Sequence, residues 1–140
     1  MRIVVDTNVT SELMRPAPAT RVREWVLATS PGDLFTTAIT LAEIRYGIER
    51  LPAGKRKDQF RQTADEIFES FASRVLPFDA AAAARYASIV DSREKSGQPI
   101  DGFDAQIASI CKTNNAKLAT RNTDDFKKTG VELINPWEER

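Results

Sequence analysis

Three acidic residues in separate parts of the sequence have surroundings that suit metal-ion chemistry. Asp6 ends the apolar stretch IVVD, Glu43 lies within AITLAEIRYGI, and Asp104 lies within PIDGFDAQIASIC. Carboxylate oxygens are the ligands that Mg²⁺ prefers in proteins, and Mn²⁺ accepts the same ligands. An ion held in this way can activate water and polarise a phosphodiester. Each of the three residues also has a structural interpretation, which has to be weighed against metal binding.

Asp6 follows residues 3–5, an apolar run of β-branched side chains that predicts a buried strand. A carboxylate at such a strand end can serve as the N-cap of the next helix. Thr7 and Asn8 offer equally good caps, which would leave Asp6 free to bind a metal ion. The sequence alone leaves both interpretations open.

Asp104 lies on a helical face that we expect to pack inward. Asp101, Asp104, Ala108 and Cys111 follow one another at spacings of three, four and three residues, which places them on one side of a helix. A carboxylate directed at an apolar interior is costly unless it is paired with a cation or binds a metal ion. Asp104 therefore needs a partner Arg or Lys, or an ion, whereas Asp101 is interpreted as a helix cap.

Glu43 has a simple interpretation as an exposed glutamate on a helix. Its surroundings allow a second one, because Gly47 lies one turn later on the same face. A glycine at that position lets another backbone segment or a ligand come close. Metal binding by Glu43 therefore remains open.

The segment LATRNTDDF adds polar side chains directly after a predicted strand. Asn122 comes first, and Asp124 and Asp125 follow. We expect one of the two aspartates to cap a short helical turn and the other to reach the cleft at the strand end. The sequence does not decide which aspartate does which.

A cluster of basic residues occupies the region between the third and fourth predicted helices. Its members are Arg45, Arg50, Lys55, Arg56, Lys57 and Arg61. They could form a solvated helical surface or a rim that contacts phosphate groups. Both interpretations remain open at this stage.

The composition excludes several kinds of chemistry. The chain has no histidine and one cysteine, Cys111, so catalytic histidine chemistry, an internal disulfide and a cysteine-rich zinc site are excluded. Lys+Arg and Asp+Glu both number 20, and the net charge of zero argues against a strongly basic nucleic-acid coat. No apolar run approaches the roughly 20 residues that cross a membrane. We therefore expect a cytoplasmic protein with no membrane contact.

Predicted strands and helices alternate along the chain. Strands are expected at 3–5, 34–37, 74–78, 116–120 and within 131–137, and helices at 7–14, 19–28, 40–50 with Thr40 as cap, 55–72, 80–95 with Asp79 as cap, and 101–113. The alternation predicts a single α/β domain over residues 1–140, with three α/β/α layers and a central, mainly parallel sheet of four or five strands. Ligands of such sheets bind beyond the carboxyl ends of the strands. Asp6 falls there, at the end of the first strand, and Arg121 and Asn122 follow a later strand.

Five motifs in a fixed order resemble a known family. DTNV, AITLAEIRYGI, DAQIAS, ATRNTDDF and INPW together resemble the PIN-domain ribonuclease toxins of VapBC-type, or type II, toxin–antitoxin modules. The resemblance extends over nearly the whole chain and matches the family in length. The resemblance depends on all five motifs occurring in this order, because each motif alone is short.

The resemblance implies a metal-dependent endoribonuclease in which Asp6, Glu43 and Asp104 hold Mg²⁺, with Mn²⁺ as a substitute. The family often adds a fourth acid late in the chain. At one of the positions used for it this chain has Asn122, and Asp125 is the acidic candidate, so the implied catalytic set is Asp6, Glu43, Asp104 and Asp125. The resemblance also implies an RNA substrate, a cognate antitoxin, DNA contact only through that antitoxin, and a homodimer.

Two other functions have to be considered. A receiver-like signalling domain would have a pair of acids after its first strand and a phosphoacceptor aspartate at the end of its third. Here Asp6 stands alone, and Asp79 is better explained as a helix cap. A non-catalytic PIN-like binding protein is the other alternative, and the three retained acids argue against it. The acids do not distinguish RNA from DNA as a substrate, because a metal ion acts on phosphate in both.

Overall fold

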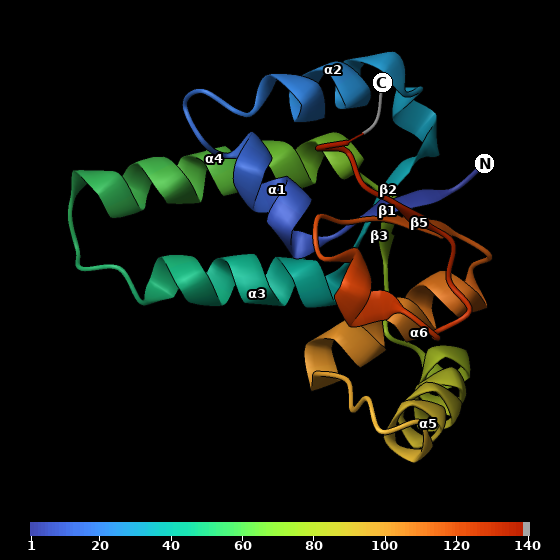
Figure 1. Cartoon of the computed structure of the whole chain (residues 1–140). Helices are drawn as coiled ribbons and strands as arrows, with labels where there is room; N and C mark the ends of the chain where they lie inside the picture. Colours follow the sequence, from blue (N-terminus) through green and yellow to red (C-terminus); the bar gives the residue numbers. More distant parts are fainter. Residues whose placement is uncertain (139–140) are drawn as a thin grey trace.

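In the part of the chain that the structure describes, five short strands form one parallel sheet at the centre of the molecule (Figure 1). The computed structural model describes residues 1–138. The strands are β1 (Ile3–Val5), β2 (Leu34–Thr37), β3 (Val75–Leu76), β4 (Lys117–Ala119) and β5 (Leu133–Ile134). Their order across the sheet is β3-β2-β1-β4-β5, and every neighbouring pair is parallel. The predicted parallel sheet is thereby confirmed.

Within residues 1–138, six α-helices and two short 3₁₀ helices connect the strands, close to the predicted ranges. They are α1 (Thr7–Leu13), α2 (Thr20–Ala28), η1 (Pro31–Asp33), α3 (Ala38–Glu49), α4 (Lys55–Phe71), α5 (Ala80–Lys95), α6 (Gly102–Thr113) and η2 (Thr123–Phe126). The predicted cap of α3, Thr40, is wrong. Thr37 caps α3, since its hydroxyl accepts a 3.0 Å hydrogen bond from the backbone N–H of Thr40, which lies inside the helix. The helix begins earlier than predicted, at Ala38 directly after β2, so the cap comes from the last residue of that strand.

Helices cover both faces of the sheet, as the alternation of side chains along β1 requires. Val4 points to one face and packs in a cluster with residues of α5 and α6, including Ile107. Ile3 and Val5 point to the opposite face, where α1, α2 and α4 cover them. The result is the predicted three-layer α/β/α arrangement, with β1 buried on both sides.

The α3–α4 pair forms a long helical hairpin with a small core of its own. Ile44 and Ile48 of α3 pack against Ala64 and Phe68 of α4. In Figure 1 the two helices run side by side and extend past the sheet. Because α3 begins directly after β2, which is parallel to β1, it starts on the side of the sheet on which β1 ends.

The strand order reverses direction at β1. From β1 the chain builds outwards through β2 to β3, and it then returns to place β4 on the other side of β1. Val5 is paired with Ala119 at the carboxyl end of the two strands, so Asp6 and Thr120 emerge side by side. Ligands of parallel α/β sheets bind at such a reversal. Among residues 1–138, no helix is both long and apolar enough to cross a bilayer.

Candidate functional site

Asp6 is buried at the end of β1 and accepts hydrogen bonds from Thr7, Thr120 and, at 3.3 Å, the side-chain amide of Asn8. The side chain is only 4% exposed. Its Oδ1 accepts a 2.8 Å hydrogen bond from the backbone N–H of Thr7, and its Oδ2 accepts one of 2.8 Å from the hydroxyl of Thr120. Asp6 therefore occupies the N-cap position of α1, so of the two interpretations left open the cap is confirmed for Asp6, and Thr7 and Asn8 do not supply it. Burial raises the pKa of Asp6, although the hydrogen bonds from Thr120 and Thr7 oppose the rise.

Glu43 reaches from α3 towards the start of α1. The hydroxyl of Thr7 donates a 2.8 Å hydrogen bond to Oε1 of Glu43. The glutamate is half-buried, and burial raises its pKa, with repulsion from Asp6 adding to the effect and the Thr7 bond opposing it. Apart from the nearby backbone of its own helix, no heavy atom lies within 4 Å of the place where a Cβ of Gly47 would be, so no other segment packs closely against this glycine. The interpretation of Glu43 as a simple exposed glutamate is wrong.

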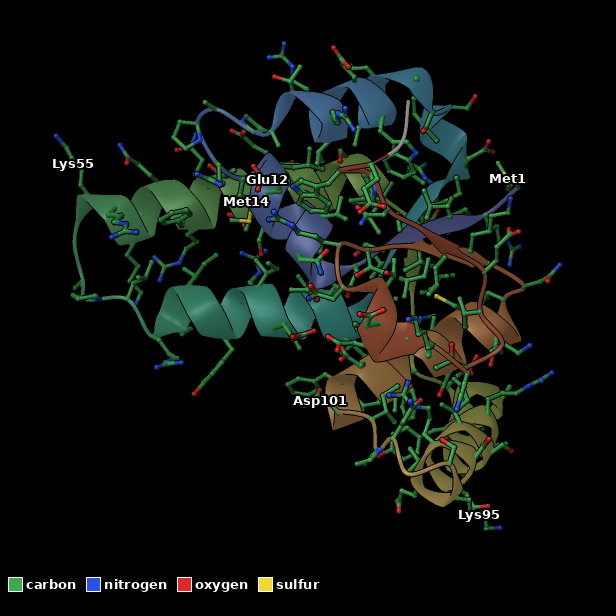
Figure 2. All side chains as sticks on the ribbon, in the orientation of Figure 1. Met1, Glu12, Met14, Lys55, Lys95 and Asp101 are labelled. Carbon is green, nitrogen blue, oxygen red and sulfur yellow. The ribbon has the colours of Figure 1, made fainter. Side chains whose placement is uncertain are left out.

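Asp104 lies in the first turn of α6, at the point where the helix face enters the core. Ala108 and Cys111 on the same face are fully buried, while Asp101 at the N-terminal end of α6 is exposed (Figure 2). The predicted cap is confirmed, since Asp101 Oδ1 accepts a 2.9 Å hydrogen bond from the N–H of Phe103. Burial, followed by repulsion from the neighbouring acids, raises the pKa of Asp104 to about 7.

None of the candidate ligands is neutralised by a basic side chain. The ion pairs within residues 1–138 do not include Asp6, Glu43 or Asp104. A structural partner Arg or Lys for Asp104, one of the two explanations that the sequence left open, is therefore wrong for this part of the chain. An ion remains as the other way to compensate its charge.

The two late aspartates differ in their surroundings. Asp124 is exposed and forms a 2.7 Å ion pair with Lys127, which lowers the pKa of the aspartate. Asp125 is also exposed, but it lies near enough to the acids for its charge to add to the raised pKa of Asp6 and Asp104. Asn122 occupies the cap position of η2, so the expectation of an aspartate cap there is wrong. Of the two aspartates, Asp125 is the one that acts on the site.

One cleft of about 430 Å³ collects these groups. Asp6, Glu43, Asp104 and Asn122 all line it, whereas Asp125 stands outside the lining. As their side chains stand within residues 1–138, no three acids meet at one point to enclose an ion. The donors are oxygen atoms, and Mg²⁺ keeps several of its own waters when it binds one or two carboxylates. The residues thus fit a divalent ion that is bound partly through water.

The structure adds supporting residues that the sequence analysis missed. The amide of Asn8 donates to Thr120 at 3.2 Å, and Thr120 in turn holds Asp6. Arg93 of α5 is 5% exposed, and its Nη1 donates to the backbone carbonyls of Asp125 at 2.9 Å and Lys127 at 2.8 Å. Thr120 is the last residue of a predicted strand, and its place at the carboxyl end of that strand could have indicated a role in the site. Nothing in the local sequence SREK distinguishes Arg93 from an exposed helical arginine.

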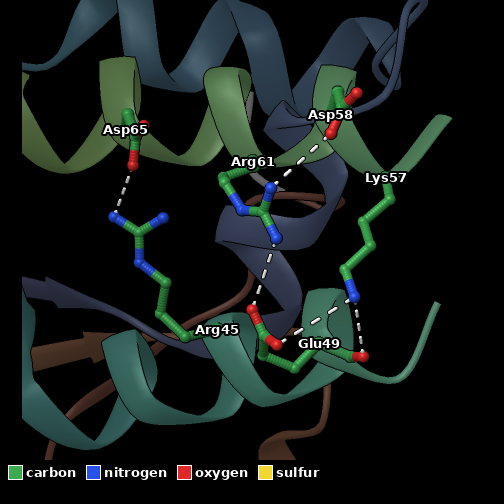
Figure 3. Close-up of polar contacts among 6 residues, drawn as sticks. All are labelled: Arg45, Glu49, Lys57, Asp58, Arg61 and Asp65. Atoms are coloured by element: carbon green, nitrogen blue, oxygen red, sulfur yellow. Dashed lines mark hydrogen bonds and ion pairs between the residues drawn. The ribbon is translucent and has the colours of Figure 1, made fainter. Parts of the chain in front are cut away.

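Three of the six residues of the basic cluster, Arg45, Lys57 and Arg61, hold the two helices of the hairpin together (Figure 3). Arg45 forms an ion pair with Asp65 at 2.7 Å. Glu49 forms ion pairs with Arg61 at 3.4 Å and with Lys57 at 4.0 Å. These pairs join α3 to α4. For these three basic residues the structural interpretation is supported by a named partner, and a phosphate-contacting rim is not needed to explain them.

The fold and the cleft define a parallel α/β/α protein with carboxylates at the reversal of strand order. The profile of the PIN domain matches residues 3–132. The chain is 40% identical over 137 residues to the VapC ribonuclease Y4jK of Sinorhizobium fredii, covering 97% of this chain and 98% of the relative. It is 38% identical over 138 residues to the toxin FitB of Neisseria gonorrhoeae, covering 98% and 99%. The chain belongs to the PIN-domain family, in the branch of the VapC-type toxins.

A solved structure agrees with the sequence relatives. The structure of FitAB bound to an IR36 DNA fragment superimposes with a TM-score of 0.91 at 38% identity, over 99% of this chain and 97% of that one. The receiver-like alternative is wrong, because the family is shown to be another one. The residue that would be its phosphoacceptor, Asp79, caps α5 by accepting a 2.9 Å hydrogen bond from Ala82.

Proposed function

We propose that this protein is a metal-dependent endoribonuclease and the toxin component of a type II toxin–antitoxin pair. One observation carries the proposal. Asp6, Glu43 and Asp104 come from three separate elements, line a single cleft, and have no cationic partner within residues 1–138. Membership of the PIN-domain family and the names of the ribonuclease and toxin relatives support RNA as the substrate.

The three acids are the proposed ligands of a divalent ion, with Mg²⁺ preferred and Mn²⁺ as a substitute. Such an ion would supply Lewis-acid activation of water and of the scissile phosphodiester. The chain's own contribution is to hold the acids in place. Thr120 fixes Oδ2 of Asp6 and Thr7 fixes Oε1 of Glu43, both at 2.8 Å.

Asp125 is proposed as the fourth acid of the catalytic set. It stands outside the cleft lining but within electrostatic reach of Asp6 and Asp104, which suits contact through a water molecule. Asn122 lines the cleft itself, and its amide oxygen is a further neutral ligand. Arg93 fixes the backbone around Asp125 through the carbonyl of that residue.

The acidic cleft also suggests how the partner binds. We propose that a cognate antitoxin inserts a segment with a basic side chain, which approaches Asp6, Glu43 or Asp104. Contact with DNA is assigned to the antitoxin, since this chain has a net charge of zero and FitAB is the assembly whose structure contains DNA. A homodimer, a cytoplasmic location and a single domain over residues 1–140 complete the proposal.

A panel of labelled structured RNAs tests the function. Cleavage is expected with Mg²⁺ or Mn²⁺ and is expected to stop in EDTA, because the cleft has no histidine or cysteine that could act without an ion. Single-stranded DNA of the same sequences serves as the substrate control. Activity that persists in excess chelator, or that DNA supports equally well, would contradict the proposal.

A further inference from the structure

The cleft that would bind RNA is strongly acidic. Four carboxylates line it: Asp6, Glu12, Glu43 and Asp104. Each phosphate of an RNA backbone also carries a negative charge, so the same groups that suit a metal ion repel the substrate. Binding therefore benefits from a cation that is supplied by the protein itself at the cleft.

Two cationic side chains line the cleft, and one of them is already engaged. Arg15 forms an ion pair with Glu12 at 3.4 Å. Glu12 is 8% exposed and also accepts a 2.9 Å hydrogen bond from the backbone N–H of Ala19. Arg15 is thus the charge partner of a buried glutamate, since removal of a partner would leave that carboxylate uncompensated.

Arg121 is the other cation, and its charge is not engaged by an acid. The ion pairs within residues 1–138 do not include it. Its guanidinium carbon lies 5.1 Å from the ring centroid of Trp137, which also lines the cleft. An arginine stacked on an aromatic ring keeps its N–H donors in the plane of the guanidinium available for a ligand.

The backbone of Arg121 is fixed next to the acids. Its N–H donates a 3.3 Å hydrogen bond to Oδ1 of Asn8. The preceding residue, Thr120, donates to Asp6, and the following one, Asn122, donates its N–H to Thr120. The loop after β4 therefore holds, in consecutive positions, a hydroxyl that binds Asp6 and a guanidinium with no ion-pair partner among residues 1–138.

We infer that Arg121 is a substrate-binding residue that contacts a backbone phosphate of the RNA in the acidic cleft. The inference rests on the proposed ribonuclease function. A guanidinium offers two parallel N–H donors that match two phosphate oxygens. The ring of Trp137 orients the guanidinium before the RNA arrives, which reduces the side-chain entropy lost on binding.

Kinetics of matched variants provide the first test. Arg121→Met is expected to lower kcat/KM on a cleaved RNA by roughly 10- to 100-fold, the effect of losing one charge-assisted hydrogen bond. Arg121→Lys should lie between, because it keeps the charge and loses the paired donors. Arg23→Met removes a charge from the exposed part of α2 and should stay within about twofold of the original activity.

RNA binding without cleavage separates a phosphate contact from a structural role. In an Asp104→Asn background, Arg121→Met should reduce the slope of log Kd against log salt by about 0.7 for a single strand, while Arg23→Met should leave it unchanged. The affinity for Mn²⁺ is measured by electron paramagnetic resonance in the protein that retains Asp104. It should stay equal or rise after Arg121→Met, because a positive charge near the proposed ion site has been removed.

The outcomes distinguish this inference from the function on which it rests. If the unchanged protein cuts no RNA, the ribonuclease proposal fails. If it cuts RNA and Arg121→Met cuts equally well, the inference about Arg121 alone is overturned. An Arg121→Met variant with a lower Tm and an unchanged salt slope would show that the residue only braces Trp137. Weaker Mn²⁺ binding with an unchanged slope would likewise overturn the phosphate contact.

Discussion

The hydroxyl of Thr7 lies 2.8 Å from Oε1 of Glu43 and donates a hydrogen bond to it. The backbone N–H of Thr7 donates at the same time to Oδ1 of Asp6. One residue at the start of α1 therefore contacts two of the candidate ligands, one from β1 and one from α3. The relative position of these two carboxylates depends on Thr7, although Thr7 itself is not an acid.

Replacement of this hydroxyl should disturb the site more than the fold. Thr7→Val keeps the shape and loses the donor to Glu43, so we expect kcat/KM for RNA to fall by about 10-fold, the value of one hydrogen bond to a charged group. Thr7→Ser keeps the donor and should retain most of the activity. Equal activity of the Val and Ser variants would show that the hydrogen bond does not orient Glu43.

Asp104→Asn should abolish cleavage and leave the protein at least as stable. Asp104 has a pKa raised to about 7 by burial and by repulsion from its neighbours, so the amide keeps the shape and removes an unfavourable charge. In EDTA at pH 8 the Tm should rise by roughly 3 °C per kcal/mol of relieved repulsion. Melting curves in EDTA beside cleavage assays in Mn²⁺ measure both effects. A lower Tm together with retained cleavage would point to a structural role for this carboxylate.

The raised pKa of Asp104 also predicts how pH acts on the metal-free protein. Between the ordinary value of 3.8 and about 7, the folded state binds more protons than the unfolded state, so stability falls as pH rises through this window. A divalent ion competes with those protons. The rise in Tm on adding Mg²⁺ should therefore be larger at pH 8 than at pH 5.5. An equal rise in Tm at both pH values would show that the ion does not bind to these acids.

The two neighbouring aspartates of η2 form a matched pair of variants. Asp125→Asn should lower cleavage, because Asp125 acts on the charges of Asp6 and Asp104. Asp124→Asn should change little, since that side chain is exposed and paired with Lys127. Rates at saturating and limiting Mg²⁺ would show whether Asp125 acts through the ion. A larger effect of Asp124→Asn would reverse the assignment made from the structure.

Strand and helix periodicity was sufficient to predict the sheet, and the position of Asp6 at a strand end follows from it. The burial of Asp104 was also predictable, because residues at helical spacing share a face. The roles of Thr7 and Arg93 were not. Thr7 meets Glu43 and Arg93 meets Asp125 across 36 and 32 residues of sequence, and such contacts depend on how the helices pack on the sheet.

Arg93 connects two segments that carry acids of the site. Its Nε donates to the carbonyl of Gln98 at 2.6 Å, in the loop that leads to α6, and its Nη1 donates to the carbonyls of Asp125 and Lys127. A lysine offers one charged nitrogen and cannot reproduce this planar set of donors. Arg93→Lys should therefore destabilise the fold by about 2–4 kcal/mol, since buried carbonyls lose their donors. Arg85→Lys on the exposed side of α5 is the control.

A double-mutant cycle can separate the effect of Arg93 on the site from its effect on stability. Cleavage should be measured well below the Tm of every variant, so that all of them are folded. If Arg93 positions Asp125, then Arg93→Lys should lower the rate in the original protein and have little further effect in Asp125→Asn, because the group that it positions is already lost. Additive losses of rate would instead show that Arg93 does not act through Asp125. The contact of Arg93 with the carbonyl of Gln98, in the loop before α6, would then be the first alternative to test.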